Sequence, residues 1–228
     1  MAFPLTHLLV ADEISKTDPD PGLFLLGSIA PDAIHYRPKY KNWSSKGFSK
    51  NGIGPAKKIT HLCPISDEKW GYITDNNGWA QQVKNFLNQN PNSPQHKGYA
   101  AHILTDILNN QTIWTTFRKN HPKEAAKGYS GRYYDELKNI DLKLYHEYYK
   151  NSRIPELLKD TTAKDMPNLV AAEEIHAIRD NILYVQYKDA PPPSQMDYLY
   201  VNFDEVLDFI QEAARYVYTF PEELCIIK

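Results

Sequence analysis

The spacing of apolar residues along the chain predicts a protein built from helices. Apolar side chains recur every three or four residues, the period of a helix with one buried face, over residues 6–16, 22–30, 79–88, 94–110, 129–149, 169–187 and 203–218. Alternating apolar and polar positions, which indicate strands, are scarce, and "YLYVNF" at 198–203 is the best example. We therefore predict a single all-α, multi-helical domain spanning residues 1–228.

Two stretches interrupt this helical pattern. Residues 35–59 are rich in Pro, Gly, Ser and Lys and show no clear period. Loops of that length are usually either functional or disordered. The sequence "DAPPPSQ" at 189–195 is typical of a turn or short linker.

The polar face of the predicted helix around "GYAAHILTDILNN" (98–110) is unusual in composition. His102 and Asp106 are four residues apart, so their side chains lie one turn apart on the same face. Water-exposed faces usually carry Lys and Glu, and this face has neither. Its His, Asp, Thr and Asn residues suit a polar cavity or a bound ion better than bulk water.

Three further residues are candidates for the same chemistry, although each has a simpler interpretation. His7 lies on the apolar side of the first helix and so points inward, where a buried polar group needs a partner; a carbonyl could serve as well as a metal. Asp32 directly follows Pro31 at a helix end, where it could face a cleft or simply form a turn. His61 closes the irregular segment in "KKITHL".

Together, these histidines and aspartates form a set of metal ligands. Imidazole nitrogens and carboxylate oxygens are ligands that Zn²⁺ accepts, and one Asp can bridge two ions through its two oxygens. Two ions about 3.5–4 Å apart would activate a water molecule and stabilise the charge that develops on a phosphate. The set therefore predicts a metal site with phosphoesterase chemistry.

Composition and charge narrow the alternatives. The net charge of -2 gives no general attraction to nucleic acid or to an anionic membrane. A single-strand nucleic-acid binder, suggested by the tyrosines and by "RPKYKNWSSKGFSK", therefore ranks last, and no stable nucleic-acid binding is expected. No apolar run approaches the roughly 20 residues of a transmembrane helix, and no secretory signal is evident. Cys63 and Cys225 lack metal or redox spacing, so we expect a cytoplasmic protein without disulfides.

The ordered segments "THLLVADEI", "FLLGSIAPD", "KKITHL" and "GYAAHILTDIL" resemble the bacterial zinc-dependent phospholipase C family, which is related in fold to the single-strand-specific zinc nucleases. The likeness covers about the first half of the chain and includes an Asn-Trp-Ser-Ser loop at 42–45, as in cytoplasmic hydrolase-like members. It implies an all-helical domain with a three-metal cluster in a cleft. Carried over by position, the ligands of one zinc site would be Asp32, His61, His102 and Asp106.

The resemblance also implies roles for single residues. Asp106 would bridge to a second ion that His7 also binds, and Asp32 would be the general base acting on a metal-bound water. The chain departs from the family at its start, where it has Met-Ala-Phe in place of a processed tryptophan, and at Thr112, where the secreted enzymes have a histidine. Both departures concern the third ion, so we expect one or two zinc ions, or other divalent transition metals. Two interpretations of "EEIHAIRD" stay open: Glu173, His176 and Asp180 could supply further ligands, or they could form an exposed face beside Arg179.

Two functions of different classes follow. The first is a metal-dependent hydrolase that attacks a small-molecule or lipid phosphate ester with a metal-activated water. The alternative is a non-catalytic helical protein that keeps one structural or ligand-binding metal. Four protein ligands around one ion would form a closed, structural site, whereas an ion on His7 would have few protein ligands and would leave room for water and substrate. The second ion therefore favours the enzyme.

Overall fold

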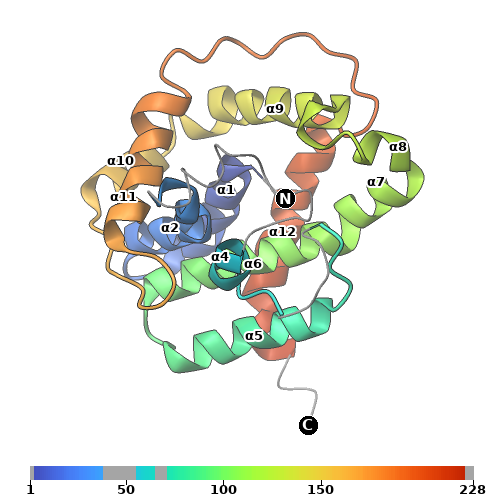
Figure 1. Cartoon of the computed structure of the whole chain (residues 1–228). Helices are drawn as coiled ribbons and strands as arrows, with labels where there is room; N and C mark the ends of the chain where they lie inside the picture. Colours follow the sequence, from blue (N-terminus) through green and yellow to red (C-terminus); the bar gives the residue numbers. More distant parts are fainter. Residues whose placement is uncertain (1–2, 38–54, 65–70, 224–228) are drawn as a thin grey trace.

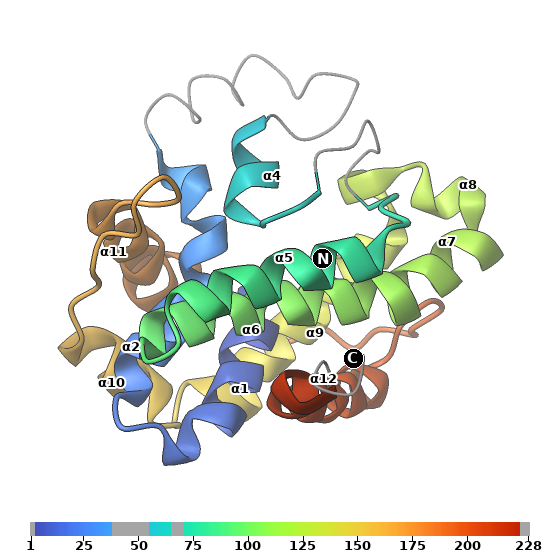
Figure 2. The same cartoon turned by 90° about the horizontal axis from the view of Figure 1, so that it is seen from below.

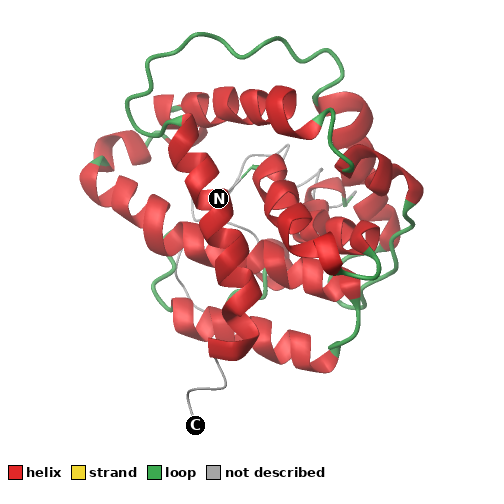
Figure 3. Cartoon of the chain, turned by 180° about the vertical axis from the view of Figure 1, so that it is seen from behind, coloured by secondary structure: helices red, strands yellow, loops and turns green. Residues whose placement is uncertain are grey.

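The computed structural model describes residues 3–37, 55–64 and 71–223, which form one all-α domain (Figure 1). Within these ranges there is no strand, and Met166 and Val170 form only an isolated bridge (Figure 3). The α-helices are α1 (Pro4–Ile14), α2 (Pro21–Ile29), α4 (Pro55–Thr60), α5 (Asn76–Gln89), α6 (Pro94–Asn109), α7 (Thr115–Asn120), α8 (Pro122–Ala125), α9 (Arg132–Leu144), α10 (Ile154–Asp160), α11 (Ala172–Asn181) and α12 (Phe203–Glu223). The predicted all-α class is confirmed.

Short segments of other helical types adjoin these helices. The 3₁₀ segments are η1 (Ser15–Thr17), η2 (Ala30–Tyr36) and η4 (Gly128–Ser130), and the π-helical segments are η3 (Asn110–Trp114), η5 (Tyr145–Tyr149) and η6 (Ile182–Gln186). The longest predicted helices, 129–149 and 169–187, therefore each end in a π-helical turn. As predicted, α2 ends just before Pro31, but the chain continues as η2 and does not leave the helical region.

Local sequence explains where the two central helices begin. Proline occupies the first turn of both α2 and α6, where its missing N–H costs no hydrogen bond. The Asp20 carboxylate accepts a hydrogen bond from the Leu23 amide, and the Ser93 hydroxyl accepts one from the His96 amide. Each cap satisfies an amide that the helix leaves unpaired.

Two glycines allow α2 and α6 to pack against each other at backbone distance. A Cβ atom added to Gly98 would lie 1.9 Å from the Phe24 carbonyl oxygen, and one added to Gly27 would lie 2.1 Å from the Gln95 carbonyl oxygen. Both neighbours are backbone atoms and cannot rotate away. Only glycine is compatible with this contact, which sets the distance between α6, the helix of His102 and Asp106, and α2, whose Ser28 carbonyl binds His102.

The remaining helices surround this central pair. Helix α1 packs mainly on α2, α6 and α12, and α5 covers the other side of α6 (Figure 2). The η2 segment packs on α11, and α10 packs on α2. In the part of the chain that the structure describes, no helix is long and apolar enough to cross a membrane.

The structure corrects two local expectations. Residues 55–60, at the end of the stretch without a clear period, form α4; residues 38–54, including the Asn-Trp-Ser-Ser loop, lie outside the described residues. The stretch 198–202, the best strand candidate, forms no strand. Instead, the backbone amides of Leu199, Tyr200 and Val201 donate to the fully buried Glu136 carboxylate. Cys63 is buried and forms no disulfide with any described residue.

Candidate metal centre

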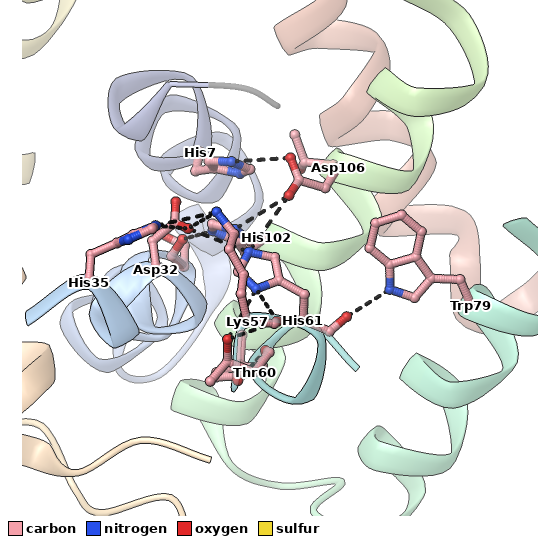
Figure 4. Close-up of polar contacts among 12 residues, drawn as sticks. His7, Asp32, His35, Lys57, Thr60, His61, Trp79, His102 and Asp106 are labelled. Atoms are coloured by element: carbon pink, nitrogen blue, oxygen red, sulfur yellow. Dashed lines mark hydrogen bonds and ion pairs between the residues drawn. The ribbon is translucent and has the colours of Figure 1, made fainter. Parts of the chain in front are cut away.

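The α6 helix places His102 and Asp106 one turn apart, and both side chains are buried. His102 Nδ1 donates a hydrogen bond to the Ser28 carbonyl oxygen at 2.7 Å, since a carbonyl can only accept. The lone pair of this imidazole is therefore on Nε2, which lies 3.8 Å from Asp106 Oδ2 (Figure 4). A histidine fixed in this way through its other nitrogen is typical of a metal ligand.

The α1 helix brings His7 close to the other carboxylate oxygen of Asp106. The His7 and His102 rings are stacked, with centroids 3.7 Å apart and planes inclined by 10°. His7 Nε2 lies 3.7 Å from Asp106 Oδ1. The two carboxylate oxygens of Asp106 thus face different histidines, an arrangement that suits a bridging ligand.

His61 follows the last residue of α4, and its position is fixed by the end of that helix. Its Nδ1 lies 3.1 Å from the Lys57 carbonyl oxygen, so Nε2 again faces the carboxylates. His61 Nε2 lies 3.5 Å from Asp32 Oδ1 and 3.9 Å from Asp106 Oδ2. The Trp79 indole donates to the His61 carbonyl at 2.7 Å (Figure 4), which ties this helix end to α5.

Asp32 lies in η2 and contacts two residues besides His61. Its Oδ1 accepts a hydrogen bond from the Lys57 ammonium at 3.0 Å and lies 3.7 Å from His35 Nε2. Lys57 is buried, and it was not among the residues that the sequence suggested. The sequence feature that could have indicated Lys57 is its position four residues before His61, one helical turn away and on the same side.

The five predicted ligands, His7, Asp32, His61, His102 and Asp106, thus come together from four parts of the chain. Ligand atoms on the edges of a tetrahedral zinc site, with bonds of about 2.0–2.2 Å, lie about 3.3–3.6 Å apart. The shortest distances between Nε2 and carboxylate oxygen atoms are 3.5–3.9 Å, and in each three-residue group that could hold an ion the ligand atoms lie within 4.8 Å of one another, so modest side-chain movement would bring them to coordination distance. The residues therefore fit a transition-metal ion.

Two overlapping triads could each hold an ion: His7, His102 and Asp106, or Asp32, His61 and His102. His102 belongs to both. Because its Nδ1 is bonded to a carbonyl, only one lone pair remains, and one lone pair binds one ion. If His102 joins Asp32 and His61, a second ion has His7 and Asp106 Oδ1 as its protein ligands.

Several buried polar atoms in this cluster lack hydrogen bonds. Among the described residues, His7 Nδ1, His102 Nε2 and Asp106 Oδ1 have no hydrogen-bond partner. A buried unsatisfied polar group costs roughly 1–3 kcal/mol. A bound cation would satisfy the last two atoms.

Burial sets the protonation states that metal binding requires. Burial, reinforced by the neighbouring His102, lowers the pKa of His7 to about 3. Burial and Lys57 outweigh Asp32 to lower the pKa of His61 to about 4. Burial alone would raise the pKa of both aspartates, but Lys57 beside Asp32, and His7 and His102 beside Asp106, hold each pKa below its usual range. At pH 7 His7 and His61 are therefore neutral imidazoles, and Asp32 and Asp106 are ionised carboxylates, as metal binding requires.

We expect the metal-free protein to become less stable as the pH falls from 7 to 4. A histidine whose pKa is lower in the folded state binds a proton more readily in the unfolded state. The free energy of unfolding therefore falls as the pH drops from the unfolded-state pKa, 6.5, towards the folded-state pKa, about 3 for His7 and about 4 for His61. At pH 5 this amounts to about 2 kcal/mol for each histidine. Urea unfolding with a chelator present measures it, and a free energy of unfolding unchanged between pH 7 and 5 would contradict the assignment.

The residues of "EEIHAIRD" do not join the cluster. His176 Nε2 accepts a hydrogen bond from the Ala163 amide at 2.9 Å, and Asp180 accepts one from Arg179 at 2.8 Å. Glu173 is exposed. Thr112, at the position of the missing histidine, donates to the Leu108 carbonyl of its own helix. His176, Asp180 and Thr112 thus have structural partners, and among the described residues none of these side chains belongs to a group of three or more that could hold an ion.

The chain matches no protein-family model, no curated protein and no solved structure. The geometry and chemistry of the cluster are therefore the basis for inferring its function.

Proposed function

We propose that the protein is a metal-dependent hydrolase of phosphate esters, with zinc as the expected metal. The observation that carries the proposal is the convergence of the three histidines and two aspartates at coordination spacing, with unsatisfied donor atoms directed at one another. The resemblance to zinc-dependent phospholipase C agrees with this function and remains a prediction. When bound, a divalent metal would activate water and stabilise the charge that develops on a phosphate.

The residues of the chain have distinct proposed roles. Asp106 faces both His7 and His102 and would orient the two halves of the centre. Asp32 is the more exposed of the two carboxylates, with 20% of its side chain accessible against 3% for Asp106. It is therefore the carboxylate that a water molecule and a substrate can reach, and the one placed to accept a proton.

A panel of phosphate esters tests this function. We expect the protein to hydrolyse p-nitrophenyl phosphate, bis-p-nitrophenyl phosphate or p-nitrophenyl phosphorylcholine in the presence of Zn²⁺, Mn²⁺ or Fe²⁺. Asp32→Asn should lower the rate by about 100-fold, because general-base catalysis contributes roughly that much. The exposed Asp135, replaced by Asn, is the matched control and should retain activity.

The alternative function is a metal-binding protein without catalysis, and it rests on the four-ligand site that the resemblance implies. Asp32, His61, His102 and Asp106 would saturate a single tetrahedral ion, and a saturated ion is typical of structural sites. Stoichiometric metal together with no hydrolysis of any ester by the wild type would support this alternative and reject the hydrolase.

A further inference from the structure

Lys57 introduces a positive charge where a cation is least expected. Its side chain is only 4% exposed, and its ammonium lies 3.0 Å from Asp32 Oδ1 and 3.4 Å from His35 Nε2. The same Asp32 oxygen is 3.5 Å from His61 Nε2. A metal ligand oxygen is thus shared with a fixed positive charge.

The buried ammonium contacts the most exposed side chains of the cluster. The side chains of His7, His61, His102 and Asp106 are at most 3% exposed, whereas those of Asp32 and His35 are 20% and 40% exposed. Among the described residues of the cluster, solvent therefore reaches the ligands from the side of Asp32 and His35. Lys57 Nζ contacts both of these side chains from the buried side, so a ligand that reaches Asp32 comes next to its positive charge.

A cation in this position has two opposing effects. It repels a divalent metal and competes for the Asp32 carboxylate, so it weakens metal binding. It also attracts an anion, because an ammonium next to a metal gives phosphate oxygens two cationic groups to bind. A site evolved only to hold a metal would gain from a neutral residue here.

We infer that Lys57 is the anion-recognising residue of this site, which weakens metal binding through Asp32 and holds the phosphate group of the ligand. The inference rests on the proposed function for its choice of phosphate. If Lys57 served only to neutralise Asp32, the result would differ. Its removal would then disturb the cluster and weaken the binding of zinc and of phosphate alike.

Calorimetric titration of the purified full chain tests the inference. Zn²⁺ is titrated into metal-free protein, and inorganic phosphate into zinc-loaded protein without excess zinc. For Lys57→Met we expect zinc to bind at least tenfold more tightly and phosphate at least tenfold more weakly. Lys58→Met, on the same helix, should change both affinities by less than twofold. If Lys57→Met is unfolded by circular dichroism, Lys57→Gln, which keeps a hydrogen-bond donor for Asp32, should show the same opposite shifts.

The outcomes separate this inference from the proposed hydrolase. A fall in both affinities, or an unchanged phosphate affinity, overturns it, even in a chain that hydrolyses esters. The opposite shifts in a chain that hydrolyses no ester would keep the inference and reject the hydrolase. A wild type that binds no zinc overturns both.

Discussion

Wild-type protein is expected to carry at least one transition-metal ion per chain, and His102→Ala is expected to be purified without metal. His102 is the one residue shared by both triads that could hold an ion, so its loss breaks either site. Loss of a residue that merely orients a ligand typically weakens metal binding 10–100-fold, and loss of the ligand itself should exceed about 100-fold. Elemental analysis of protein purified without added metal measures the effect.

His176→Ala is the matched control for this experiment. Like His102→Ala, it removes a histidine from a helix. His176, however, is half-buried and accepts a hydrogen bond from a backbone amide outside the cluster. Its metal content should equal that of the wild type, and a loss would show that α11 contributes a ligand after all. A wild type that is folded and free of metal would count against both the hydrolase and the metal-binding alternative.

Gly98→Ala is expected to destabilise the protein by about 3–5 kcal/mol, the range of severe core substitutions. The new methyl group would lie 1.9 Å from the Phe24 carbonyl oxygen, so α2 and α6 would have to move apart. Chemical denaturation measures the loss. Gly27→Ala, on the facing helix, should behave similarly because its methyl group would meet the backbone of Gln95.

Gly78→Ala is the control for the glycine prediction. Its added methyl group would also be too close to a neighbour, at 2.1 Å, but that neighbour is the end of the Asp75 side chain. The side chain can rotate away, which costs a helix cap of about 1 kcal/mol, while alanine gains a similar amount in helix propensity. A stability of Gly98→Ala equal to that of Gly78→Ala would contradict the backbone contact.

The sequence predicted which histidines and aspartates come together better than it predicted their surroundings. His102 and Asp106 follow from helical spacing, and His7 from its place on an apolar face, because both depend on local periodicity. The contacts of Lys57 with Asp32 and of Trp79 with the His61 carbonyl join residues 25 and 18 positions apart in the chain. No local pattern encodes such contacts, so the cation and the support of α4 became visible only in the structure.

In the fold, too, features set by local sequence patterns were predictable and features set by distant contacts were not. Helical periodicity located the long helices, but short α4 has too few residues to display a period. The π-helical ends of two predicted helices are changes in hydrogen bonding that the apolar pattern does not reveal. The apparent strand at 198–203 was misleading because the backbone amides of this stretch bind the distant Glu136 carboxylate, a partner that alternation cannot indicate.

The hydrogen bond between His102 and the Ser28 carbonyl has a consequence for how the centre tolerates genetic variation. Every amino acid carries a main-chain carbonyl, so no single replacement at position 28 can delete this acceptor. Ser28 is fully buried, and changes there would act through side-chain volume and through the loss of its hydroxyl's hydrogen bond to the Leu25 carbonyl. Substitutions that push the helices apart would therefore misdirect the imidazole without altering any residue that touches it.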